Sequence, residues 1–82
     1  MVYYPTGVCA QEISIEVQGE VIQSVSFKGG CNGNSQGISK LVEGMNIDDA
    51  ISRMQGIRCG RRSTSCPDQL ATALKKIQTL DQ

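Results

Sequence analysis

The sequence predicts an α+β domain, in which a small antiparallel sheet of two to three strands is covered on one face by three helices. Strand-like alternation is confined to residues 2–28, and the 3-4 apolar spacing that is typical of helices appears only after it. Strands followed by helices indicate this layered fold class. We expect the helices at about residues 35–43, 47–55 and 67–80. A length of 82 residues fits a single domain spanning residues 1–82.

The sheet is predicted from the first third of the chain. Residues 11–18 alternate strictly between apolar and polar side chains, which indicates a strand with one buried face. A turn at Gly19-Glu20 leads into a second strand over residues 21–28. The segment around residues 2–4 is expected to add a third strand, which Pro5 and the glycine after it would end.

The hairpin between the two long strands needs an irregularity. We expect Val21, Val25 and Phe27 on the buried face of the second strand. A regular two-residue turn would put Val25 and Phe27 on the solvent side instead, because one step of register exchanges the two faces. We therefore predict a bulge near residues 18–21 or further along the second strand.

The helical part follows a loop at residues 29–34, which is too rich in glycine for a helix. Gly44 and Gly56 are expected to end the first two helices, and Asn46 to cap the second. Pro67 suits the first position of the last helix, with an acidic residue behind it as a helix-end charge partner. The expected apolar stripes are Ile38, Leu41 and Val42; Ile47, Ala50, Ile51 and Met54; and Leu70, Ala73, Leu74, Ile77 and Leu80.

Composition excludes several function classes. Eight basic residues balance eight acidic ones, so no overall charge favours nucleic acid or a membrane. With three aromatic residues there is no stacking platform for single-stranded nucleic acid. No apolar run approaches the roughly 20 residues of a membrane-spanning helix, and the first residues do not resemble a signal peptide. We therefore expect a cytoplasmic protein, in which cysteines favour metal ligation or redox chemistry over structural disulfides.

Four cysteines, Cys9, Cys31, Cys59 and Cys66, offer the chemistry of this chain. The sequence has no histidine, so a metal site would draw on sulfur, and four thiolates suit a tetrahedral Zn²⁺ site. The intervening stretches of 21, 27 and 6 residues contain no CxxC pair, so position and not spacing carries the prediction. All four lie in predicted loops or at helix ends, and helix N-termini stabilise negative charge. We predict that they bind one metal ion.

Other interpretations of the cysteines stay open. Each one alone is more simply a small buried hydrophobic residue. A disulfide between Cys59 and Cys66 is feasible across the short loop but disfavoured in a reducing compartment. A thiol enzyme or sulfur carrier would instead use Cys66 or Cys31 as an exposed nucleophile.

Three arginines, Arg58, Arg61 and Arg62, surround Cys59. They would offset the formal −2 charge that four thiolates and Zn²⁺ carry together. The simplest alternative is a solvated basic loop. The sharper interpretation is a site for an anion or nucleotide, in which Arg61, Arg62 and a helix N-terminus would bind phosphate.

Residues 64–68 read Thr-Ser-Cys-Pro-Asp, the string that names the TSCPD domain family. The segments at residues 29–34, 41–44 and 56–60 also resemble that family, and the resemblance covers nearly the whole chain. Its members occur alone or at the C-terminal end of vitamin B12-dependent ribonucleotide reductases. The resemblance thus implies a link to ribonucleoside-diphosphate reductase and deoxyribonucleotide synthesis. The catalytic barrel and cobalamin site of that enzyme cannot fit in this chain, so we expect an accessory, metal-binding module that is not catalytic alone.

The order of Cys9, Cys31 and Cys66 also resembles the U-type iron–sulfur cluster scaffolds, which implies a similar fold and an iron–sulfur cluster as the alternative cofactor. Two departures favour a retained zinc ion. Gln11 and Ser65 stand where the scaffolds have an aspartate and, in many members, a histidine, and Cys59 is additional. An all-sulfur site of this kind is typically structural.

Overall fold

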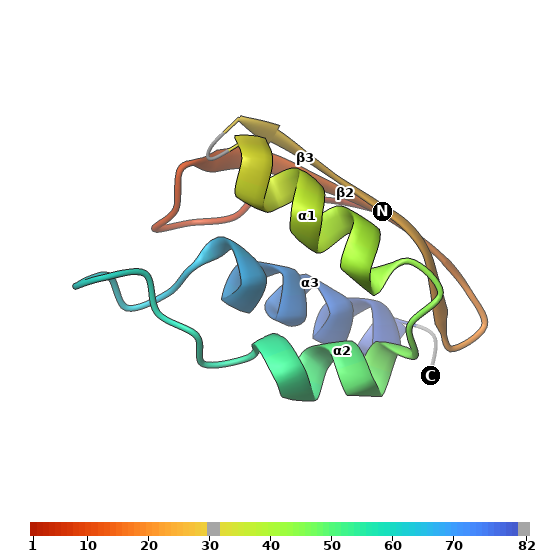
Figure 1. Ribbon diagram of the computed structural model, residues 1–82. Coiled ribbons are helices and arrows are strands. Elements are labelled where there is room, and N and C mark those ends of the chain that lie inside the picture. Colours follow the sequence, from red (N-terminus) through yellow and green to blue (C-terminus); the bar gives the residue numbers. More distant parts are fainter. Residues whose placement is uncertain (30–31, 81–82) are drawn as a thin grey trace.

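The computed structural model describes residues 1–29 and 32–80 and confirms the α+β fold. Three antiparallel strands form one sheet in the order β1-β2-β3, and the three helices lie on one face of it (Figure 1). The elements are β1 (Val2–Tyr3), β2 (Ala10–Gln18), β3 (Val21–Gly29), α1 (Asn32–Val42), α2 (Ile47–Met54) and α3 (Cys66–Leu80). β1 confirms the predicted third strand, and its Tyr3 pairs with Ile13 of β2.

The β2–β3 hairpin contains the predicted bulge, further along the second strand. Val17 pairs with Ile22, whereas Glu16 pairs with Ser24, so Gln23 is the extra residue on β3. The turn itself is the two-residue one that the sequence indicated. The extra residue shifts the alternation of side chains along β3 by one position. Ile22 before the bulge and Val25 after it can therefore both face the core despite the two-residue turn.

The bulge also corrects one expected core residue. Val25 is buried and faces Ile15, and the half-buried Phe27 faces Ile13, as predicted. Val21 is 42% exposed, and its neighbour Ile22 takes the buried position. Because the bulge lies after Ile22 and not before Val21, the start of β3 has the opposite phase to its end.

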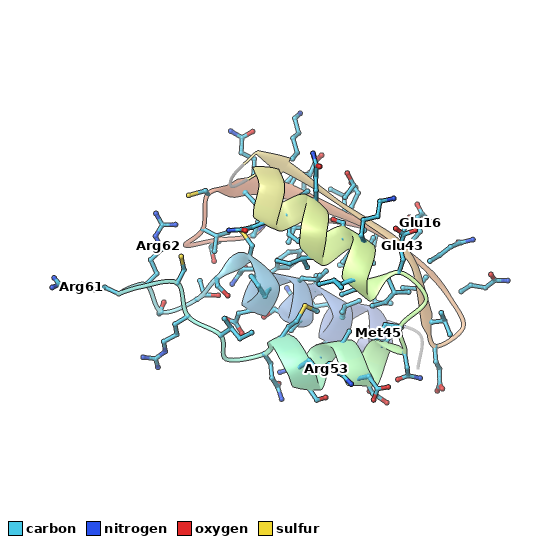
Figure 2. The ribbon with its side chains drawn as sticks, viewed as in Figure 1. Glu16, Glu43, Met45, Arg53, Arg61 and Arg62 are labelled. Carbon is cyan, nitrogen blue, oxygen red and sulfur yellow. The ribbon has the colours of Figure 1, made fainter. Side chains whose placement is uncertain are left out.

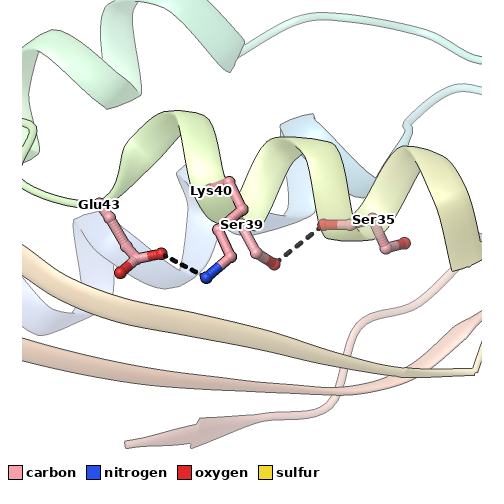
Figure 3. Close-up of polar contacts among 4 residues, drawn as sticks. All are labelled: Ser35, Ser39, Lys40 and Glu43. Atoms are coloured by element: carbon pink, nitrogen blue, oxygen red, sulfur yellow. Dashed lines mark hydrogen bonds and ion pairs between the residues drawn. The ribbon is translucent and has the colours of Figure 1, made fainter.

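α1 begins at Asn32, three residues earlier than predicted. Gly33 lowers helix propensity, but α1 as a whole packs against β3, and tertiary contacts commonly override propensity. Lys40 pairs with Glu43, which follows the helix, at 3.5 Å, and the Ser39 hydroxyl donates to the Ser35 carbonyl (Figure 3). Gly44 follows with a φ of 80° and ends the helix as expected.

The apolar stripe predicted for α1 is wrong at one position. Val42 is buried and Ile38 packs against the core, but Leu41 is 76% exposed. Residues 41 and 42 project about 100° apart on a helix, so one of them faces away when the other faces the sheet. Leu41 is thereby left on the surface.

The two later helices follow their predicted patterns. The Asn46 side chain accepts a hydrogen bond from Asp48 N at 2.9 Å and caps α2. α3 begins at Cys66, one residue before the predicted Pro67, because Ser65 is its cap. All four predicted inward residues of α2 are buried, as are Leu70, Ala73, Leu74 and Ile77 of α3.

The core is aliphatic and lies between the sheet and the helices. Its largest fully buried side chains are Ile13, Ile15, Ile22, Leu70 and Leu74. The aromatic residues Tyr3 and Phe27 pack only at its edge. Each described helix is too short or too polar to cross a membrane.

Candidate functional site

The segments that carry the cysteines converge on one end of the molecule. β2 begins one residue after Cys9, α3 begins with Cys66, and Cys59 lies in the loop that precedes α3. The starts of β2, α1 and α3 lie at the same end (Figure 1). Cys31 stands in the sequence directly before α1 and lies outside the described residues. We call this end, with the loop at residues 57–65, the thiol end.

Two of the thiols line one cavity. Cys59 and Cys66 contribute to a cavity of about 460 Å³, together with Asn34 and Ser35 from the first turn of α1. Cys59 is exposed and Cys66 is half-buried, and both are free thiols. The cavity therefore joins the loop, the start of α3 and the start of α1.

A third thiol is held to the same loop. The Arg62 guanidinium donates a hydrogen bond to the sulfur of Cys9, at 3.4 Å between Nη1 and Sγ. Arg62 N also donates to the Cys59 carbonyl at 3.0 Å, and Cys59 N donates to the Thr64 carbonyl at 3.2 Å. The loop thus folds back on itself around Cys59 and contacts Cys9 through one side chain.

The loop is fixed by three polar side chains at the start of α3, which we call the clamp: Thr64, Ser65 and Asp68. The Asp68 carboxylate accepts hydrogen bonds from Gly56 N at 2.7 Å and from the Thr64 hydroxyl. The Ser65 hydroxyl donates to the Ile57 carbonyl at 2.6 Å and accepts from Asp68 N at 3.2 Å. Both ends of the loop are therefore bound to the first turn of α3.

A buried glutamine extends the clamp to the segment before Cys9. Gln69 Nε2 donates to the Thr64 hydroxyl at 3.0 Å, while its carbonyl oxygen accepts from Thr6 N at 3.1 Å. Gly7, with a φ of 72°, lies so close to Thr64 that an added Cβ would come within 3.0 Å of its methyl group. Sequence reasoning missed Gln69, since nothing in its spacing distinguishes a buried polar residue from a surface one.

Asp68 does more than the predicted helix-end charge partner. The hydrogen bonds from the Thr64 hydroxyl and from Gly56 N lower the pKa of Asp68 below its ordinary value of 3.8, and Lys75 adds a smaller effect in the same direction. Partial burial opposes them. The carboxylate form is therefore the one that closes the clamp.

The family model of the TSCPD domain matches residues 1–78 of the 82-residue chain. The chain belongs to the TSCPD domain family. No curated protein and no solved structure matches it. In this TSCPD domain the residues at positions 64–68 have two different roles. Thr64, Ser65 and Asp68 form the clamp, and Cys66 lies at the cavity that the clamp shapes.

The donor types of the thiol end suit a soft metal ion, since zinc favours cysteine sulfur and the chain has no imidazole. Among residues 1–29 and 32–80, no three cysteine or carboxylate side chains lie close enough to share an ion. The described part of the structure thus brings Cys59 and Cys66 to one cavity and Cys9 to the same loop, without a completed ligand set.

The arginines of the loop differ in their surroundings. Arg58, Arg61 and Arg62 are all exposed, but Arg62 contacts Cys9, and Arg61 lies at the outer tip of the loop (Figure 2). Positive charge therefore lies beside one of the thiols. The anion-binding role of the three arginines stays a prediction.

Proposed function

We propose that this TSCPD domain is a metal-binding accessory module in which Cys9, Cys31, Cys59 and Cys66 hold one Zn²⁺ ion. The observation that carries the proposal is the clamp, which fixes the loop with Cys59 against the helix start with Cys66 so that both thiols line one cavity. Contacts of this kind around metal ligands orient them and raise metal affinity.

The charge balance of the thiol end supports the proposal. Four thiolates and Zn²⁺ carry a formal −2 charge. The N-terminus of α3 at Cys66 and the guanidinium of Arg62 beside Cys9 place positive charge near two of the four sulfurs. A structural or regulatory zinc site is therefore the function that the chemistry of this end favours.

The metal content of protein purified without oxygen tests the proposal. Native mass spectrometry should find about one zinc per chain, and Cys59→Ser and Cys66→Ser should each lose it. Ser63→Ala is the matched control, because this exposed loop residue lies between the two thiols and should keep the zinc. A metal-free protein, or full zinc content in both cysteine variants, would refute the site.

The same preparation distinguishes the rival functions. An iron–sulfur cluster carrier would contain iron and sulfide in labile form. A thiol-redox or sulfur carrier would contain no metal and would alkylate rapidly at Cys31 or Cys66. Either result would replace the zinc proposal with the corresponding carrier function.

We further propose a vitamin B12-dependent ribonucleotide reductase as the partner, on the basis of the family's domain associations. The zinc-loaded protein should co-elute with such an enzyme in gel filtration, and the chelator-treated protein should bind it more weakly. Unchanged elution of both components at micromolar concentrations would argue against this partner.

A further inference from the structure

An apolar groove runs between α1 and α2, apart from the clamp. It has a volume of about 330 Å³, and its floor consists of the buried residues Val42, Ala50 and Met54. Its rim carries Leu41 of α1 and Ile57, which follows α2. The groove thus lies along two helices and has an apolar floor and rim.

The rim residues are unusually exposed for their type. Leu41 is 76% exposed and Ile57 is 43% exposed, and both line this one groove. A single exposed leucine is ordinary on a protein surface, but two large aliphatic residues beside an apolar hollow indicate a surface that binds a partner. Covering a leucine side chain contributes roughly 1.5–3 kcal/mol, which makes Leu41 an effective anchor point.

The charge around the groove indicates the kind of partner. Arg53 is the charged side chain among the described residues that line it, and it lies on α2 (Figure 2). The chain that continues from it, residues 53–67, contains four arginines and no acidic residue, and Arg53 is the one of the four that lines the groove. Within the described ranges, no carboxylate lies at ion-pair distance from Arg53, and Glu43 on the α1 side already pairs with Lys40. A partner with a carboxylate opposite Arg53 would complement this side of the groove.

We propose that the groove binds an acidic amphipathic helix of another protein. Its apolar side chains, spaced i, i+3, i+4 and i+7, lie over the floor and beside Leu41, and its acidic face lies toward Arg53. The groove is lined at helical spacing by Ile38, Leu41 and Val42 of α1 and by Ala50, Arg53 and Met54 of α2, and a groove between two helices suits an amphipathic helix. Because the groove shares Leu41 with the cavity of Cys59 and Cys66, the bound helix lies next to the thiol end. The proposal does not depend on a bound metal.

A pair of model peptides tests this docking surface. Both are 16-residue helices with leucine at the i, i+3, i+4 and i+7 positions. One has glutamate at its remaining positions and the other has lysine. Fluorescence anisotropy at low salt should show binding of the acidic peptide at least about tenfold tighter than that of the basic one, and this difference should shrink as salt is added.

Three variants identify the surface that the peptide uses. Leu41→Glu should weaken binding of the acidic peptide about tenfold or more without unfolding the protein, since Leu41 is 76% exposed. Arg53→Glu should reduce or invert the preference for the acidic peptide. Val21→Glu is the matched control, because Val21 is a 42% exposed aliphatic residue that is not among those lining the groove, and it should bind as the unmodified protein does.

Several outcomes would overturn the proposal: no binding of the acidic peptide, equal binding of both peptides, or unchanged binding by Leu41→Glu. Sedimentation analysis supplies another. A dimer of the unmodified protein that Leu41→Glu dissociates would assign the groove to a second copy of this chain and not to an acidic helix.

Discussion

The helical body and the thiol end of this domain are held together by different forces. The body, built on the buried faces of β2, α2 and α3, is an aliphatic core in which the largest side chains are almost fully buried. The thiol end is held by hydrogen bonds that join the side chains of Thr64, Ser65, Asp68 and Gln69 to backbone groups and to one another. The body therefore specifies the fold, and the clamp specifies where the loop with Cys59 lies.

This difference explains how a small domain can carry reactive groups at its surface. An apolar core buries the side chains that it fixes, whereas Cys59 stays exposed in its loop. Hydrogen bonds to a loop backbone position exposed thiols without covering them. Substitutions in the body should therefore lower the free energy of unfolding most, whereas substitutions in the clamp should mainly disturb the loop.

The largest effect is expected in the body. Leu74→Ala removes a fully buried side chain from α3 and should lower the free energy of unfolding by about 2–5 kcal/mol. Urea denaturation followed by circular dichroism measures this loss. A change of less than about 1 kcal/mol would show that the core is not the main source of stability.

Asp68→Asn should act mainly on the thiol end. The amide keeps one oxygen acceptor but loses the charge that strengthens both hydrogen bonds, so the free energy of unfolding should fall by only about 1 kcal/mol. Hydrogen exchange should accelerate at residues 57–64, and zinc affinity should fall about tenfold. Asp49→Asn, at an exposed position in α2, is the control and should alter neither hydrogen exchange in the loop nor zinc affinity. Slow exchange retained throughout the loop would contradict the role of the clamp.

Two glycine substitutions of the same size compare the segment before Cys9 with helix α1. Gly7→Ala forces a side chain into a φ of 72° and against the Thr64 methyl group, so it should destabilise the protein by about 1 kcal/mol. Gly37→Ala, within α1 and with open space around it, should stabilise the protein by up to about 1 kcal/mol. Thermal denaturation of both variants provides the test, and a stabilising Gly7→Ala would mean that the segment before Cys9 does not pack on Thr64.

The smallest effect is expected from acid, which should remove the contribution of Asp68 to the stability of the protein. Because the pKa of Asp68 is lower in the folded protein than its ordinary value of 3.8, its contribution is fully present above that value and is lost as the pH falls through the lower, folded-state value. With chelator present to exclude effects of metal release, stability should decline more steeply below a pH of 3.8 than it does in Asp68→Asn. Parallel stability curves for the two proteins would contradict this contribution.

The periodicity of the sequence predicted the body well, because the body is stabilised by burying apolar residues that recur at regular spacing. The strands, the bulge, the α2 cap and the buried stripe of α3 all follow from local pattern and register. Leu41 was misplaced because residues 41 and 42 project about 100° apart on the helix, and packing against β3 decides which of the two is buried. The early start of α1 was missed for the same reason, since that packing outweighs the propensity of Gly33.

The thiol end was less predictable, because its order depends on contacts between residues distant in the sequence. The string at residues 64–68 identified the family, but not that Thr64, Ser65 and Asp68 bind the preceding loop. The contact between Gln69 and Thr6 spans 63 positions and leaves no local pattern. The metal ligand set, the cytoplasmic location and the partner enzyme stay predictions.

X-ray absorption at the zinc edge tests most directly whether the four thiols act as one site. Protein purified without oxygen should show a first shell of four sulfur atoms at about 2.3 Å from zinc, with one sulfur fewer in Cys59→Ser. A shell dominated by oxygen or nitrogen, or four sulfurs that persist in Cys59→Ser, would contradict the account.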